Sequence, residues 1–255
     1  MRAASVVARL RAVAAASEGA VRLGPGVSDQ TIDGWGVPVP ADIRVLAQEI
    51  GEIWFDEYDP ITFTHSENSA PGCCRGGAAG TWWVLHTNGA AETYYADIDP
   101  ETGAWGRVFS HWEDDSAALV AESVLDWFES LAEGLDLAVR IAAGERHPDL
   151  REELDEDELG ELDFEDVFID WFHRGGDVLV FDAEAIVAPM PVAEARYSPD
   201  PELAAVAAAL PEGGVLADLR DAGYPTSVPF GYLRGGPAKY RRLSGGAFLA
   251  AIPSN

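Results

Sequence analysis

The residues of this chain best suited to chemistry are two adjacent cysteines and five scattered histidines. His65 precedes a Gly-rich stretch that contains Cys73 and Cys74. Thiols and imidazoles bind zinc, but a structural zinc site needs four ligands and usually draws on cysteines two to four residues apart. The same stretch leads into Thr81-Trp82-Trp83, a strand pattern, whereas a phosphate-binding loop ends in Gly-Lys-Ser/Thr before a helix. We therefore expect a surface loop here, with neither a metal nor a cofactor.

Close pairs of carboxylates are the other candidates for acid–base chemistry. The chain holds 44 acidic residues, so such pairs arise by chance in solvated turns. The sequence contains no Gly-x-Ser-x-Gly nucleophile turn and no His-Glu-x-x-His zinc motif. Catalysis also needs a base, a nucleophile and oxyanion donors that converge, and no such set stands out. The sequence favours a protein that is not an enzyme, with a hydrolase using carboxylates or the His65 and Cys73 region as a minor alternative.

The charge of the chain narrows the class of partner. The 255 residues include 44 acidic and 17 basic side chains, which gives a formal charge of −27. Binding to nucleic acid and adhesion to anionic membranes both depend on clustered Lys and Arg, so this composition argues against either. No apolar run approaches the roughly 20 residues of a membrane span, and the N-terminus lacks the pattern of a signal peptide. We expect a cytoplasmic protein with a protein partner.

Apolar spacing and turn residues predict the secondary structure. Helices are expected over residues 3–16, 40–51, 116–143 (with Glu133-Gly134 as a candidate break), 167–172 and 199–210, and a short turn capped by Ser28 is expected through Ile32. Strands are expected over residues 52–55, 61–63, 81–87, 91–97, 105–110, 177–181, 227–233 and 247–252. Asn88-Gly89 lies between two of these strands and is the strongest short-range hairpin signal. Three consecutive strands joined by tight turns predict an antiparallel meander.

The expected fold class is α+β, an antiparallel sheet (a meander) flanked by helices, with a C-terminal α/β extension. Charge suggests where the domains end, because ten acids and no base lie between Glu152 and Asp166. Such a run is typical of a solvated linker or an exposed helix. We therefore predict a domain at residues 1–144, an acidic linker or exposed helix at 145–170 and the extension at 171–255.

Aromatic and acidic residues around the meander are the candidate binding residues. Trp82 and Trp83 are consecutive on a predicted strand, so their side chains point to opposite faces of the sheet. We expect core or helix-covered positions for both, but an exposed tryptophan would be an interface anchor. The candidate partner-binding residues are Trp35, Trp82, Trp83, Asp97, Asp99, Glu113, Asp114 and Asp115.

Turn and apolar positions around the meander are similar to those of a known family. The segment Tyr94–Phe109 holds a strand that ends in Asp, a turn and the pattern Gly-x-Trp-Gly-x-Val-Phe. A predicted helix that holds Val120–Phe128 follows, and upstream Val39-Pro40-Ala-Asp42 opens a helix that ends at Gly51. This combination resembles the SUKH superfamily, and its Smi/Knr-like group, over roughly residues 20–135. The resemblance implies an α+β fold without catalytic residues and, because bacterial members are commonly immunity proteins, a role in neutralising a toxin such as a nuclease.

Two kinds of partner stay open for a binding protein of this composition. A negative surface attracts a basic toxin domain and can occupy its phosphate-binding groove. An intracellular scaffold or regulator would instead bind an acidic partner through the extension at 171–255. The basic cluster of that segment is Arg234, Lys239, Arg241 and Arg242.

Overall fold

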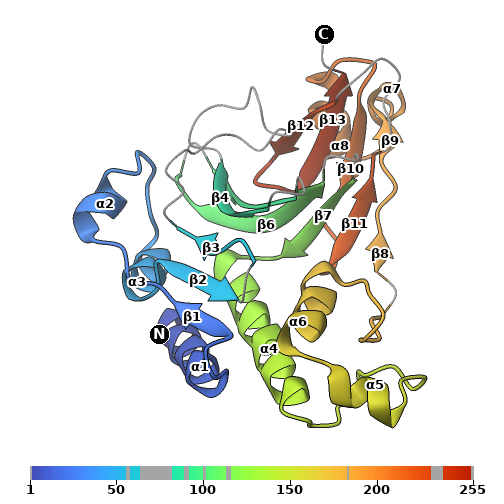
Figure 1. Ribbon diagram of the computed structural model, residues 1–255. Helices are drawn as coiled ribbons and strands as arrows, with labels where there is room; N and C mark the ends of the chain where they lie inside the picture. The colour runs from blue at the N-terminus through green and yellow to red at the C-terminus, as the bar shows by residue number, and fades with distance from the viewer. Residues whose placement is uncertain are drawn as a thin grey trace. The chain divides into compact units, whose positions relative to one another are not determined.

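The chain passes back and forth between two structural units of an α+β protein (Figure 1). The computed structural model describes residues 2–55, 58–63, 82–88, 92–99, 102–112, 116–182, 184–230 and 238–253. One unit, which we call the helical unit, comprises Met1–Gly34, Ala41–Thr64 and Leu125–Ala183. The other, the sandwich unit, comprises Trp35–Pro40, His65–Val124 and Glu184–Asn255. The predicted boundaries at 144 and 170 therefore differ from the observed division, because each unit is assembled from separate chain segments.

The helical unit combines helices with a small antiparallel sheet. Its elements are α1 (Arg2–Ala16), β1 (Val21–Leu23), α2 (Asp29–Asp33), α3 (Ala41–Glu49), β2 (Glu52–Phe55), β3 (Ile61–Thr62), α4 (Val124–Ala142), α5 (Glu156–Glu161) and α6 (Phe164–His173). Strand β2 is central and pairs with β1 and β3. Helix α2 begins where the sequence predicts, because the Ser28 side chain accepts a hydrogen bond from the Thr31 amide at 3.1 Å. No helix in the described ranges is long and apolar enough to cross a membrane.

Gly134 allows α4 and α6 to approach closely. A Cβ atom at this position would lie 2.2 Å from Cδ2 of Trp171, so a larger residue would collide with the indole. The Trp171 ring stacks on Phe168 with their ring centroids 5.9 Å apart, and Phe168 packs edge-on against Phe55 of β2 with a centroid distance of 4.7 Å. These rings join α4, α6 and the small sheet into one packed core.

The sandwich unit contains two sheets and two short helices. Its elements are β4 (Trp82–Thr87), β5 (Thr93–Ile98), β6 (Trp105–Trp112), β7 (Ser116–Ala121), β8 (Ala185–Ile186), β9 (Met190–Pro191), α7 (Val192–Ala195), α8 (Pro201–Ala208), β10 (Val215–Asp218), β11 (Thr226–Pro229), β12 (Ala238–Leu243) and β13 (Phe248–Pro253). One sheet has the strand order β4-β5-β6-β7-β11-β8, and the other has β12-β13-β10-β9. Both are antiparallel except for the β11–β8 pair. The predicted meander is confirmed as β4 to β6, and the same sheet is completed by β11, which pairs with β7, and by β8, which pairs with β11 (Figure 1).

The core of the sandwich unit lies between its two sheets. Tyr95 and Leu119 of the first sheet pack in one cluster with Leu249 and Ala251 of the second. The alternate residues of β13, such as Phe248, pack in another cluster with helices α7 and α8. Because both faces of β13 are covered, its sequence is almost continuously apolar rather than alternating.

The structure corrects two predicted elements. Residues 116–121, predicted to begin a long helix, form strand β7, and helix α4 begins at Val124. The apolar residues of this segment fit helical spacing, but β7 pairs with β6 on one side and with the distant β11 on the other. The predicted strand at 177–181 is wrong as well, because its described pairing is an isolated bridge between Leu150 and Leu179.

Candidate functional site

The two strand tryptophans are both buried, so neither is a surface anchor. Trp82 is 7% exposed and packs in the core between the two sheets, in agreement with the core or helix-covered position that the sequence predicts. Trp83 is 1% exposed and lies on the opposite face, with its ring 4.6 Å from that of Trp35 and 5.5 Å from that of Trp105. Trp35 is itself half-buried. These three candidates therefore supply internal contacts of the sandwich unit.

Asp97 is also internal, because it forms a buried ion pair. It lies on the same face of β5 as Tyr95, at a point where the pairing with β6 is irregular. The Arg242 Nε atom of β12 donates a hydrogen bond to Asp97 Oδ1 at 2.5 Å, and the guanidinium carbon lies 4.7 Å from the Tyr95 ring centroid. The side chains of Arg242 and Asp97 are 6% and 8% exposed. Asp97 and Arg242, which the sequence indicated as contact residues for a partner, thus join the two sheets to each other.

Of the other predicted contact residues, Asp99 lies in a turn, Arg241 lies on a strand, and the rest fall outside the described residues. Asp99 is half-buried and accepts a hydrogen bond from the Thr102 amide at 2.8 Å, which orders the turn before β6. Arg241 is exposed on β12. The candidates that lie outside the described residues are Glu113, Asp114, Asp115, Arg234, His65, Cys73 and Cys74.

The strongest negative surface of the described chain lies in the helical unit, at residues 152–166, which we call the acidic belt. Helix α5 buries none of its residues. The Asp155 side chain caps it by accepting hydrogen bonds from the Asp157 and Glu158 amides, both at 2.9 Å. Asp163 caps α6 in the same way, accepting from the Asp166 amide at 3.0 Å. Carboxylates at helix N-termini are favoured by the helix dipole, so the belt is locally ordered despite its charge.

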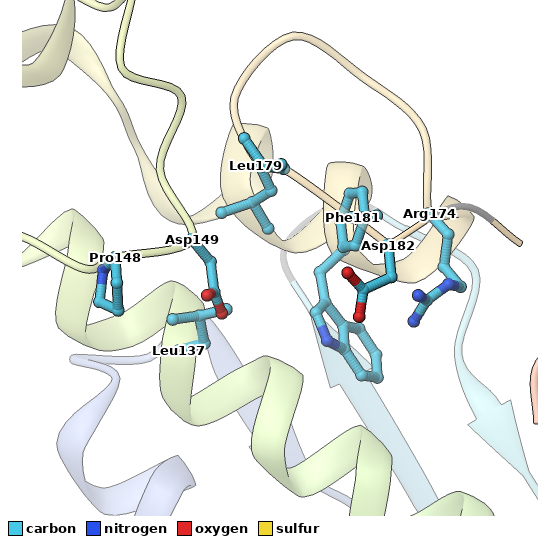
Figure 2. A pocket seen from close by; sticks show the side chains of 9 residues that line it. Leu137, Pro148, Asp149, Arg174, Leu179, Phe181 and Asp182 are labelled. Carbon is cyan, nitrogen blue, oxygen red and sulfur yellow. The ribbon is translucent and has the colours of Figure 1, made fainter.

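A pocket of about 380 Å³, which we call the α4–α6 pocket, opens in the same unit (Figure 2). Leu137 of α4, Pro148 and Asp149 line one part of it. Trp171 and Arg174 contribute from the end of α6, and the segment 179–182 completes the wall. The acidic belt lies in the chain between Asp149 and Trp171, so lining residues of the pocket both precede and follow it in the sequence.

A buried carboxylate holds the pocket wall in place. Asp170 is 4% exposed, and its Oδ2 atom accepts a hydrogen bond from the Leu179 amide at 2.6 Å. A Cβ atom on Gly176 would lie 1.1 Å from Asp170 Oδ1, so only glycine allows the loop to pass this carboxylate. The Val180 amide donates to the Asp149 carbonyl at 2.7 Å, which fixes segment 179–182 against the other wall. The geometry of the pocket is therefore set by backbone contacts as well as by packing.

Sequence reasoning found the belt but missed the pocket. The run of acids was visible directly, whereas Trp171, Arg174 and Phe181 meet Asp149 only after α6 has turned back. The positive φ of 51° at Arg174, a backbone conformation that favours glycine, ends the helix and starts this return. Gly175-Gly176 in the sequence was the one local signal of such a turn.

A separate charge network in the sandwich unit carries the clearest pKa shifts. The Arg220 guanidinium donates hydrogen bonds to Asp218, Asp200 and Glu202, and its carbon lies 4.8 Å from the Phe248 ring centroid. Its hydrogen bonds lower the pKa of both Asp200 and Asp218, and these carboxylates raise the pKa of Arg220. Asp200 also caps α8, so the network supports the fold.

Comparison with known proteins adds no family to this description. Among the described residues, no group of three or more His, Cys, Asp or Glu side chains could hold a metal ion. The chain matches no protein-family model, no curated protein and no solved structure. The class that fold and site define is an α+β protein with an exposed acidic belt and an adjoining chain segment that forms an open pocket.

Proposed function

We propose that this chain is a non-enzymatic protein-binding module that meets a basic protein domain through its acidic belt. The observation that carries the proposal is the exposure of the belt, where ten carboxylates and no base lie between Glu152 and Asp166. Arg146 approaches Glu156 at 3.7 Å, and both of these side chains are largely exposed. A cationic partner would relieve the mutual repulsion of these carboxylates and would be steered toward them.

The finer proposal is that the partner is a nuclease-like toxin and that the chain is its immunity protein. This identity rests on the resemblance of residues 20–135 to the SUKH superfamily. One part of that resemblance changes with the structure, because Val120 lies in β7 and the helix that contains Phe128 begins at Val124. The acidic belt supports the basic character of the partner independently of the family.

The alternative in which an acidic partner binds the C-terminal cations is weaker. Arg242 is occupied by Asp97 inside the sandwich unit, so it cannot belong to a surface cluster with Arg241. The remaining members of that cluster have no described side chains.

The proposed function is tested by isolating the partner and rebuilding the complex. The full chain is immobilised in a native lysate at about 50 mM NaCl, the retained protein is identified, and both partners are purified for calorimetry. We expect a basic protein that binds in a 1:1 complex, with an affinity that falls at least tenfold between about 50 and 300 mM NaCl. Failure to recover a partner at low salt, or turnover of a small compound by the chain, would contradict the proposal.

Two matched variants separate the belt from net charge. The triple variant Glu152→Gln, Glu153→Gln and Asp157→Asn neutralises exposed belt residues that cap no helix. The control triple Glu122→Gln, Glu194→Gln and Asp221→Asn removes the same charge from exposed positions of the sandwich unit. We expect at least a tenfold loss of affinity for the first and less than a threefold loss for the second. Equal losses would mean that the belt is not the binding surface.

A further inference from the structure

The lining of the α4–α6 pocket is suited to a cationic side chain, and we propose that it receives an arginine or lysine of the basic partner. This assignment rests on the proposed function and names the residue type that one subsite of the interface selects. The pocket lies in the helical unit, and its lining includes Asp149, which precedes the acidic belt in the chain, and Trp171, which follows it. Its volume of about 380 Å³ is at the lower end of the range for ligand sites, which suits one side chain and its neighbours better than a large ligand.

Two carboxylates supply the charge that such a side chain needs. Asp149 and Asp182 both line the pocket and are exposed (Figure 2). The Asp149 side chain lies 3.4 Å from His147 Nδ1, and the Asp149 main chain is fixed by the Val180 amide. In the described chain, Asp182 has no ion-pair partner. A guanidinium or ammonium group in the pocket would form charge-assisted hydrogen bonds with either carboxylate.

Aromatic and aliphatic side chains supply the rest of the lining. Phe181 offers an aromatic ring of the kind that attracts cations, whereas Trp171, whose ring packs against Gly134 and Phe168, adds apolar surface. Phe181 already has such a contact, because the Arg174 guanidinium carbon lies 5.1 Å from its ring centroid. Leu137 and Val180, of which Val180 is 56% exposed, offer apolar surface to the methylene groups of a long cationic side chain.

Other ligand classes fit this lining less well. An anion would meet Arg174 but also Asp149 and Asp182, within a unit that carries 28 acidic and 9 basic residues. A neutral apolar group would remove water from two carboxylates without replacing their hydrogen bonds. A divalent cation prefers six or more oxygen ligands, and the two lining carboxylates supply too few. Arginine and lysine combine the charge and the apolar stem that the lining requires.

The test uses short blocked peptides as defined probes. Three peptides of sequence Gly-Ser-Gly-X-Gly-Ser-Gly, with X as arginine, lysine or neutral citrulline, are titrated into the ¹⁵N-labelled full chain. We expect shifts in the amide resonances of residues 179–182 and in the Trp171 indole resonance with arginine and lysine. Citrulline has nearly the shape of arginine without its charge, so its affinity should be at least tenfold weaker. Equal binding of citrulline, or shifts confined to the acidic belt, would overturn the assignment.

Two double variants tie the result to the pocket. Asp149→Asn with Asp182→Asn removes both lining charges, whereas Asp177→Asn with Glu18→Gln removes two exposed charges of the helical unit that lie outside the lining and outside the acidic belt. We expect the first pair of substitutions to lower the affinity for the arginine peptide at least tenfold and the second pair to lower it less than twofold. Phe181→Leu, which keeps apolar bulk and removes the ring, should weaken it several-fold. Unchanged circular dichroism and amide dispersion show that each variant is folded.

The same variants distinguish this assignment from the proposed function. If the pocket variant binds the purified partner normally while the belt variant does not, the pocket assignment fails and the protein-binding function stands. If the partner is not recovered but the peptides bind at the pocket, the cation subsite stands without the proposed function. Free L-arginine that binds as tightly as the peptide, with the same resonances shifted, would identify a small-molecule site and overturn the assignment to a partner side chain.

Discussion

The helical and sandwich units use charge in opposite ways. The helical unit holds 28 acidic and 9 basic residues, a formal charge of −19, and the sandwich unit holds 16 and 8, a formal charge of −8. The ion pairs of the helical unit, such as Arg9 with Glu133, have side chains that are 44% and 62% exposed. In the sandwich unit, the Arg242–Asp97 pair is more than nine-tenths buried.

This difference separates charge that supports the fold from charge that is available to a partner. Exposed ion pairs contribute little to stability, because water and salt screen them. A buried pair is far more sensitive, since removal of one member leaves the other without a counter-charge in a dry environment. In the proposed function the excess charge of the helical unit serves binding, whereas the buried pair of the sandwich unit serves stability.

The largest expected effect comes from breaking the buried pair. Arg242→Met removes the cation and leaves Asp97 buried, so we expect a loss of about 3–5 kcal/mol in the free energy of unfolding, measured by urea denaturation. The double variant Arg242→Met with Asp97→Asn leaves no unpaired charge and should recover part of this loss. Hydrogen exchange should rise first in β5 and β12. A loss below about 1 kcal/mol for the single variant would show that the pair is not structurally important.

The second effect contrasts two helical glycines within the helical unit. Gly134→Ala places a Cβ atom 2.2 Å from the Trp171 ring, and the strain should outweigh the gain in helix propensity for a net loss of about 1–2 kcal/mol. Gly160 of α5 has no atom within 4 Å of its would-be Cβ, so Gly160→Ala should stabilise the helix by about 0.5–1 kcal/mol. Thermal unfolding of both variants checks the opposite signs, and a shared sign would refute the packing explanation.

The outcome for individual elements shows what sequence can and cannot predict. Local signals were sufficient where the partner of a residue is near in the chain, as with the Ser28 cap and the antiparallel pairing of β4 with β5. They failed for residues 116–121, whose strand pairing with Thr226–Pro229 spans over a hundred residues. Asp97 was misread as a surface contact for the same reason, because Arg242 is 145 residues away. The acidic belt could be predicted because a run of acidic residues can be read directly from the sequence. The pocket could not be predicted, because it forms only when the chain after α6 folds back against Asp149.

Acid sensitivity gives a third way to sharpen the comparison. The pKa of Asp200 and of Asp218 is lowered chiefly by hydrogen bonds from Arg220. A carboxylate with a lower pKa in the folded state stabilises the fold above its ordinary pKa of 3.8, and this stabilisation is lost as pH falls through the folded value. Arg220→Gln should therefore lower the stability of the chain at pH 7. The difference in stability from the wild type should shrink as the pH falls through the folded-state pKa of Asp200 and Asp218. Urea midpoints at several pH values test this, and a difference that grows in acid would contradict it.

The smallest expected effect belongs to the exposed pairs of the helical unit. Arg9 Nη1 lies 2.9 Å from Glu133 Oε1, but both side chains are largely in water. Ordering two flexible side chains offsets most of the Coulomb attraction, so Arg9→Gln should change the free energy of unfolding by about 0–1 kcal/mol. Roughly 1 M NaCl should abolish even this difference, because the screening length then falls to about 3 Å. A loss as large as that of Arg242→Met would erase the distinction between the two units, and the acidity of the helical unit would then need a structural explanation rather than a partner.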